Sequence, residues 1–376
     1  MKNKSFDIFC TVIDNYGDIG VCWRLSRQLV AEHGATVRLW VDDLASFAVL
    51  ERRIDPTQSQ QTLCGVEVRH WSKDWSDVTP REVVIEAFAC DPPEPFLLAM
   101  AAMKPAPVWI NLEYLTAESW IDDCHGLGSR HPRLPLTRHF FFSGFSATSG
   151  GLLREGDLIE RRERFQRMER ESWLAGLGIE PSALTWPCHS LFCYDNPALP
   201  GLLARWTGEA PRLLLVADGK PRRQVEQWLG REFPVGTMAE SGALRLFALP
   251  FLSQDDYDRL LWSCDLNFVR GEDSFVRAQW AGVPLVWHIY PQDDDAHRQK
   301  LAAFLSRYQG FRDEHTADSA ESQFWLGWNG GDAAAGWDGY AAALPTLARH
   351  AADWCTQQAQ SKDLATALVL FIESRV

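Results

Sequence analysis

Short apolar runs alternate along the chain with segments whose apolar residues recur every three or four positions. Phe6–Ile13 is dominated by apolar and β-branched residues and predicts a buried strand. Val21–Glu32 has the periodicity of an amphipathic helix that ends at Gly34. This alternation favours strand–helix–strand units and a parallel sheet. In the first half we also expect strands at Thr36–Val41, Val83–Phe88, Val108–Asn111 and His139–Phe142, and helices at Leu44–Arg52 and Asp157–Ala175.

The second half restarts the same pattern. Leu184–Leu203 contains three prolines and suits a segment that crosses between domains. After it we expect strands at Arg212–Ala217, Leu244–Leu249, Asp265–Val269 and Val283–His288, and helices at Arg222–Arg231, Gln254–Ser263, Phe275–Ala281 and Ser361–Ser374. The sequence therefore predicts an α/β fold of two Rossmann-like domains facing across a cleft, residues 1–183 and 184–360, with residues 361–376 packing back on the first domain.

Composition narrows the function classes. The 376 residues include 37 Lys and Arg against 50 Asp and Glu, and the net charge of −13 argues against nucleic acid or an anionic membrane as partner. The nine cysteines form no C-x-x-C pair, so we expect free thiols in a reducing compartment. No stretch is apolar enough to span a bilayer, and the first residues lack a signal-peptide pattern. We therefore expect a cytoplasmic protein.

The first candidate site is the segment 14–20, Asp-Asn-Tyr-Gly-Asp-Ile-Gly, between the first expected strand and helix. It reads G-x-x-G rather than G-x-G-x-x-G, and the carboxylates of Asp14 and Asp18 would repel a phosphate. Two carboxylates beside glycines suit binding a cation and removing a proton from it. The alternative is that both cap the helix and bind loop amides. We favour a functional role for Asp14 and Asp18 together. We expect Asn15, Tyr16 and Gly17 to contact the substrate, and the alternative for Tyr16 is core packing.

The second candidate site is the segment 268–278, which follows an expected strand and opens a helix. Gly271 permits a tight turn, and Arg270 offers several donors to a phosphate. Free amides at the helix start would add an anion site, namely those of Asp273, Ser274 and Phe275, with the Ser274 hydroxyl as a further donor. Glu272 and Asp273 either stabilise the helix dipole or turn toward the cleft. We favour a functional role for Glu272 and leave Asp273 open.

Aromatic residues near expected strand ends form a third group: Phe192, Tyr194, Phe251 and Tyr290. Such rings stack on nucleobases, although core packing explains each ring singly. Gln254 follows in the same region. We expect no metal, because the run Asp293–Asp295 has no ligands at a recognisable spacing and no H-E-x-x-H pattern occurs.

Three motifs together resemble the bacterial protein-arginine rhamnosyltransferases that modify elongation factor P. They are the segment 9–25 around the Asp-Asn-Tyr-Gly-Asp loop, the segment 268–280, and the segment 287–292, Trp-His-Ile-Tyr-Pro-Gln. The resemblance implies a GT-B fold and inverting transfer of L-rhamnose from dTDP-β-L-rhamnose to an arginine of elongation factor P, without a metal. It implies Asp18 as the general base, Asp14 as its positioning partner and Glu272 as a group that orients the guanidinium.

By the same resemblance the second domain holds the donor. Phe192 and Phe251 would hold the thymine, and Arg270, Tyr290 and the helix amides would stabilise the leaving dTDP.

Two other classes of protein remain open. A GT-B epimerase or sugar-to-sugar transferase would not need two acids around a cation, and a non-catalytic nucleotide-binding module would leave the acid pair without a purpose. An oxidoreductase is disfavoured because neither half has a dinucleotide fingerprint.

Overall fold

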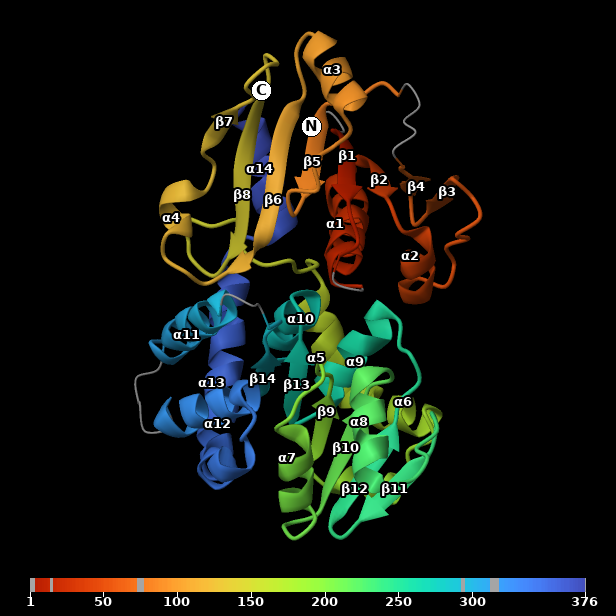
Figure 1. Ribbon diagram of the computed structural model, residues 1–376, viewed down its shortest axis with the longest axis vertical. Helices are drawn as coiled ribbons and strands as arrows, with labels where there is room; N and C mark the ends of the chain where they lie inside the picture. The colour runs from red at the N-terminus through yellow and green to blue at the C-terminus, as the bar shows by residue number, and fades with distance from the viewer. Residues whose placement is uncertain (1–3, 14–15, 73–77, 292–294, 312–317, 376) are drawn as a thin grey trace. The chain divides into compact units, whose positions relative to one another are not determined.

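The computed structural model describes residues 4–13, 16–72, 78–291, 295–311 and 318–375. The chain forms two compact units, residues 1–156 with 359–376 and residues 157–358 (Figure 1). Each unit is built around its own mostly parallel sheet. The α/β class and the two Rossmann-like domains expected from the sequence are confirmed.

The first unit has an eight-stranded sheet in the order β3-β4-β2-β1-β5-β6-β8-β7. The six inner strands pair in parallel, and β3 and β7 are antiparallel edge strands. Its strands are β1 Ser5–Cys10, β2 Thr36–Val41, β3 Gln60–Leu63, β4 Val66–His70, β5 Val83–Ala87, β6 Val108–Thr116, β7 Gly128–Arg130 and β8 Thr137–Gly144; its helices are α1 Gly17–His33, α2 Leu44–Leu50, α3 Glu94–Ala102, α4 Ile121–Cys124 and α14 Leu364–Glu373.

The terminal helix α14 completes the core of the first unit. Leu364, Leu368 and Ile372 are buried in one cluster with the apolar residues of α1 and β1. The Gln28 side chain of α1 donates to Asp363, which caps α14. Thus a segment more than 200 positions from the rest of the unit in sequence contributes to its main apolar cluster.

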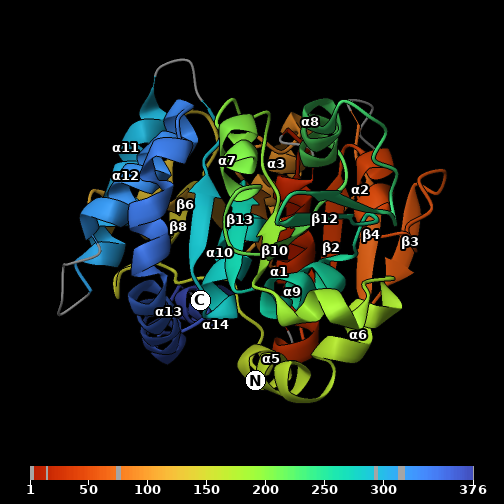
Figure 2. The same ribbon diagram turned by 90° about the horizontal axis from the view of Figure 1, so that it is seen from below.

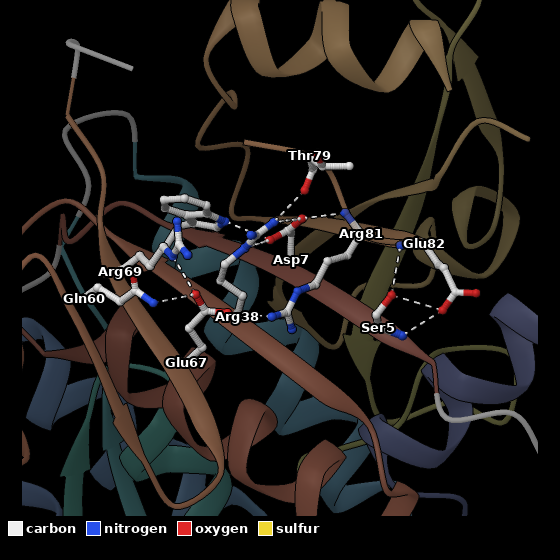
Figure 3. A network of polar contacts seen from close by, with 10 residues as sticks. Ser5, Asp7, Arg38, Gln60, Glu67, Arg69, Thr79, Arg81 and Glu82 are labelled. Carbon is white, nitrogen blue, oxygen red and sulfur yellow. Dashed lines mark hydrogen bonds and ion pairs between the residues drawn. The ribbon is translucent and has the colours of Figure 1, made fainter. Parts of the chain in front are cut away.

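A buried polar network lies toward the amino ends of β1, β2 and β4 (Figure 3). Asp7 is fully buried and accepts two hydrogen bonds from Arg38, at 2.6 and 2.9 Å, and one from the indole of Trp40 at 2.9 Å. The backbone amide of Arg81 also donates to Asp7. A buried carboxylate requires such partners, and the contacts of Asp7 with Arg38 and Trp40 join β1 to β2.

The second unit has a six-stranded sheet in the order β11-β12-β10-β9-β13-β14, parallel except for β11. Its strands are β9 Cys188–Leu191, β10 Arg212–Val216, β11 Met238–Ser241, β12 Leu244–Ala248, β13 Leu266–Arg270 and β14 Leu285–His288; its helices are α5 Leu158–Met168, α6 Arg170–Gly176, η1 Pro181–Thr185, α7 Leu199–Trp206, α8 Lys220–Leu229, α9 Gln254–Ser263, α10 Asp273–Ala281, α11 Ala296–Gln309, α12 Asp318–Gly330, η2 Ala334–Gly336 and α13 Trp337–Gln360.

Many of the tryptophans pack in the second unit. Helices α11, α12 and α13 lie together at one side of this unit, as Figures 1 and 2 show, and α12 contacts β14. Phe304 of α11 stacks on Trp325 of α12, with ring centres 5.9 Å apart, and meets Trp354 of α13 edge-on. Aromatic side chains therefore form the contacts that pack α11 against α12 and α13.

The boundary between the units differs from the one expected at 183/184. The segment expected as one helix at 157–175 breaks into α5 and α6 at Glu169, and both helices lie in the second unit. Phe165 of α5 is buried against Trp262 of α9, and Arg170 of α6 donates to the carbonyl of Ser263. These contacts assign the segment to the second unit. Among the described residues, no helix has the length and apolar character needed to cross a membrane.

Candidate active site

Each sheet has one switch point, where two neighbouring strands continue along the chain toward opposite edges of the sheet. In the first unit β1 and β5 are neighbours, but β1 leads to β2 on one side and β5 leads to β6 on the other. In the second unit β9 and β13 are the corresponding pair. Open α/β sheets bind ligands at the carboxyl ends of such strands. The segments 16–20, 192–194 and 270–275 lie at the carboxyl ends of β1, β9 and β13, whereas Phe251 and Gln254 follow β12 and Tyr290 follows β14.

Asp18 lies in the first turn of α1, directly after β1, and only 3% of it is exposed. Its Oδ2 accepts the backbone N–H of Ile13 at 2.9 Å, and its Oδ1 accepts the hydroxyl of Tyr114 at 3.2 Å. Asp18 is not the N-cap of α1, which is Tyr16. The carboxylate is therefore held by donors from the loop and from β6. The contact with the Ile13 amide is what the alternative of binding loop amides predicts, and the role of general base stays a prediction.

The other residues of this loop are only partly described. Asp14 and Asn15 lie outside the described residues, so their predicted roles stay predictions. Tyr16 is half-buried, and its carbonyl accepts the amide of Gly20 at 2.9 Å. Gly17 opens α1 and is also half-buried. Both flank Asp18 as expected, and their predicted role in substrate binding stays a prediction.

Arg270 ends β13 beside two aromatic residues that follow β9. Its guanidinium carbon lies 4.4 Å from the ring centre of Phe192 and 4.6 Å from that of Tyr194. Its Nη1 atom is buried and has no hydrogen-bond partner within the described part of the chain. A buried donor of this kind normally has an acceptor. The arrangement therefore suits an anionic ligand.

The start of α10 supplies further donors. Gly271 adopts φ = 62°, which directs the chain from β13 into the helix, and Glu272 is the N-cap without a side-chain cap bond. The first-turn amides are those of Asp273, Ser274 and Phe275. The ring of Phe275 is buried and stacked on Trp287 with centres 4.0 Å apart, so only its backbone is suited to ligand binding. A helix start beside Arg270 combines two independent means of binding an anion.

The remaining predicted residues of the second unit surround this helix start. Asp273 accepts the Gln254 side chain of α9 at 3.2 Å, which joins two of the predicted residues directly. Tyr194 is buried and meets Tyr290 edge-on, with ring centres 5.3 Å apart, whereas Tyr290 is largely exposed. Phe251 is half-buried and follows β12. No measured contact with a nucleotide bears on any of them, so their individual roles stay predictions.

Two residues near Arg270 were not assigned from the sequence. His288 ends β14 and accepts the backbone N–H of Tyr194 on Nδ1 at 3.2 Å, which leaves the proton of the neutral ring on Nε2. Burial, with the Arg270 charge, lowers the pKa of His288 to about 4. Tyr257 of α9 meets Phe192 edge-on, and burial raises the pKa of its hydroxyl. His288 stands in one of the quoted motifs, whereas Tyr257 has no motif to mark it.

Metal ligands were not expected from the sequence. The described residues contain no group of three or more His, Cys, Asp or Glu side chains placed to hold a metal ion. Asp293 and Asp294 lie outside the described part. Asp295 precedes α11 and pairs with Arg298 at 3.2 Å on the surface. The absence of a metal from the reaction stays a prediction.

Two Rossmann-like units in one chain, each with polar or aromatic residues near its switch point, have the architecture of the GT-B fold. The spinosyn forosaminyltransferase SpnP shares the fold, with a TM-score of 0.51 at 12% identity over 99% of each chain. The family model described as elongation factor P (EF-P) rhamnosyltransferase EarP matches residues 6–373. The chain belongs to this family.

Two relatives support this assignment over the whole chain. The protein-arginine rhamnosyltransferase of Pseudomonas putida is 52% identical over 375 residues, which cover 98% of each chain. A structure solved to explain EarP-mediated arginine glycosylation of translation elongation factor EF-P matches with a TM-score of 0.71 and 39% identity, and covers both chains completely. The resemblance inferred from the sequence motifs is thereby confirmed.

Proposed function

We propose that this protein transfers L-rhamnose from dTDP-β-L-rhamnose to an arginine side chain of elongation factor P, with inversion at the anomeric carbon. The observation that carries the proposal is the match of residues 6–373 to the EarP family. The fold alone is insufficient, because the alternative epimerase or sugar-to-sugar transferase would have the same architecture. The family match favours arginine transfer over both alternatives.

The acceptor needs a base. A guanidinium has a pKa above about 12 and is a poor nucleophile until a proton leaves it. Asp18 is a described carboxylate near the first switch point, and it accepts hydrogen bonds from the Ile13 amide and the Tyr114 hydroxyl. It would accept the guanidinium proton while the nitrogen attacks the sugar. Asp14 as its positioning partner and Glu272 as an orienting group remain part of the proposal.

The donor needs a site for a nucleoside diphosphate. Arg270, with its buried Nη1, and the first-turn amides of α10 would bind the phosphates and stabilise the negative charge that develops on leaving dTDP. Phe192 and Phe251 would hold the thymine ring, and Tyr290 and Gln254 would line the same site. A nitrogen nucleophile that displaces dTDP directly requires no covalent enzyme intermediate, which gives inversion.

The testing experiment is the intact mass of purified elongation factor P after incubation with this protein and dTDP-β-L-rhamnose. Fragmentation then locates any adduct. We expect one deoxyhexose on a single arginine, together with one dTDP released for each adduct. Release of dTDP without an adduct would refute the acceptor and keep a transferase. If no dTDP is released and no adduct forms, the proposed donor is refuted.

A control with dTDP-glucose tests the sugar. It has the same nucleotide but a different hexose. Equal transfer from both donors would overturn the assignment of rhamnose while leaving the arginine acceptor in place.

A further inference from the structure

The hydroxyl of Tyr114 makes a contact that the sequence motifs do not suggest. Tyr114 belongs to β6, 96 positions away from Asp18, and its hydroxyl donates to Asp18 Oδ1 at 3.2 Å. The Ile13 amide donates to the other carboxylate oxygen at 2.9 Å. Each oxygen of the predicted base therefore has a donor, one from the backbone and one from a side chain.

The Tyr114 ring is fixed by a second aromatic residue. It stacks on Phe88 with ring centres 4.3 Å apart and an interplanar angle of 13°. Phe88 is buried, whereas 37% of Tyr114 is exposed. Parallel stacking restrains the ring plane and therefore the position of the hydroxyl at its end.

The backbone of Phe88 is itself held in an uncommon conformation. Phe88 and Ala89 follow β5 with φ values of 59° and 54°, a region that non-glycine residues rarely adopt. The Phe88 amide donates to the Leu112 carbonyl at 2.7 Å, and the Ala89 amide donates to the side chain of Asn111 at 3.1 Å. Both acceptors belong to β6. The strand that carries Tyr114 thus also holds the residue on which Tyr114 stacks, and such local strain is typical of functional sites.

We infer that Tyr114 is a positioning residue that orients the carboxylate of Asp18 for proton transfer. The inference rests on the proposed function, in which Asp18 is the base. In that step the guanidinium nitrogen forms a bond to the anomeric carbon, the bond to dTDP breaks, and the guanidinium proton passes to Asp18. Tyr114 keeps its own proton throughout and acts only by hydrogen bonding to the carboxylate.

The chemistry of the hydrogen bond sets the expected consequences. A hydroxyl that donates to a carboxylate stabilises the charged form, which is the form that accepts a proton. It also restricts rotation of the carboxylate, so that one lone pair keeps a productive direction. Loss of the hydroxyl should lower turnover and shift the pH dependence, while donor binding in the second unit is unaffected.

The test compares Tyr114→Phe with wild type in the elongation factor P assay. The variant keeps the ring that stacks on Phe88 and removes only the hydroxyl. We expect kcat to fall about tenfold, in line with loss of one hydrogen bond to a charged group, with an unchanged dTDP dissociation constant. The acidic limb of the kcat profile should move to higher pH, because a carboxylate with one donor fewer takes up its proton at higher pH.

The matched control is Tyr340→Phe, which removes a buried hydroxyl that donates to the Leu285 carbonyl in the second unit. It should leave the acidic limb in place. Thermal midpoints of both variants establish that they fold. A folded Tyr114→Phe variant with wild-type kcat and pH profile would overturn the inference, as would a fall in kcat without any shift of the acidic limb.

The proposed base has a separate test. If Asp18→Asn remains active, Asp18 is not the base and the proposed mechanism fails, whatever Tyr114 does. If Asp18→Asn is inactive and Tyr114→Phe behaves as wild type, the proposed function survives and only the positioning role is refuted. The two variants therefore distinguish the two failures.

Discussion

The guanidinium carbon of Arg270 lies 4.4 Å from the centre of the Phe192 ring. The Tyr194 ring centre is 4.6 Å from the same carbon. Phe192 and Tyr194 follow β9, and Arg270 ends the neighbouring strand β13. Cation–π contacts with two rings restrict the guanidinium plane before any ligand binds. Pre-organisation of this kind lowers the entropy that binding loses.

Replacing Arg270 by lysine should therefore weaken dTDP binding despite the retained charge, because an ammonium lacks the planar fork of donors. Loss of one charged hydrogen bond corresponds to about 1.5–3 kcal/mol, or roughly a tenfold or larger rise in Kd. Titration calorimetry measures Kd, and the rise of the thermal midpoint with dTDP gives an independent check.

Arg212→Lys is the matched control for Arg270→Lys. Arg212 also lies against two rings, 4.9 Å from the centres of both Trp206 and Trp337, but it begins β10 at the opposite end of the sheet. This variant should lower the thermal midpoint and leave the dTDP Kd unchanged. Equal loss of dTDP affinity in both variants would contradict the placement of the donor phosphates at Arg270.

Asp18→Asn should abolish transfer and leave donor binding intact. The amide cannot accept the guanidinium proton, and loss of a general base lowers rates by about 10²–10⁴-fold. The measurement is kcat with elongation factor P as acceptor, together with the dTDP Kd. Asp42→Asn is a close control, because Asp42 also accepts a loop amide, that of Val12 at 2.9 Å. Comparable losses of kcat in both variants would show that loop structure, rather than base chemistry, explains the effect.

Glu86 in β5 should make the stability of the protein fall as pH rises. It is fully buried, and burial raises its pKa from 4.5 to about 7, although Arg138 at 2.7 Å opposes this shift. Between these two values the folded state keeps a proton that the unfolded state has released. The free energy of unfolding therefore decreases as pH rises through this window, by about 3 kcal/mol in total.

Glu86→Gln removes this titration and keeps an acceptor for the indole of Trp109, which donates to Glu86 at 3.2 Å. Urea unfolding at several values between pH 5 and pH 8 measures the effect. The difference between wild type and variant should change steadily across this range. Parallel curves would mean that Glu86 has the same proton occupancy in both states.

The terminal helix should be required for the stability of the first unit. Leu368 of α14 is fully buried in its core, and Leu368→Ala should lower the free energy of unfolding by about 2–5 kcal/mol. Leu370 on the same helix is 42% exposed, and Leu370→Ala should change stability by less than about 0.5 kcal/mol. Chemical denaturation compares the two. Similar small losses would contradict burial of α14 in the core of this unit.

Local patterns predicted many of the elements well. The strand expected at Thr36–Val41 is β2, and the strand expected at Arg212–Ala217 is β10 with one residue fewer. The antiparallel hairpin of β3 and β4 was not predicted, because its short strands are largely polar. The two strands are joined by the turn at Cys64 and Gly65, whose φ values are 51° and 78°.

The helix expected at Asp157–Ala175 shows the limit of periodicity. Its charged, amphipathic pattern continues through Glu169, where the structure starts a second helix. The break allows Phe165 and Arg170 to meet different parts of α9. Whether the segment forms one helix or two therefore depends on packing partners that are distant in sequence.

The sequence by itself determined the strand–helix alternation, the two motifs at the strand ends and the family to which the chain belongs, because these depend on neighbouring residues. It could place Asp18 after β1 and Arg270 at the end of β13 for the same reason. Only the tertiary structure brought Tyr114 to Asp18, Phe192 to Arg270 and α14 to α1. In a parallel sheet the carboxyl ends share one edge, but the strand order decides which ends are neighbours, and that order results from packing across the whole unit.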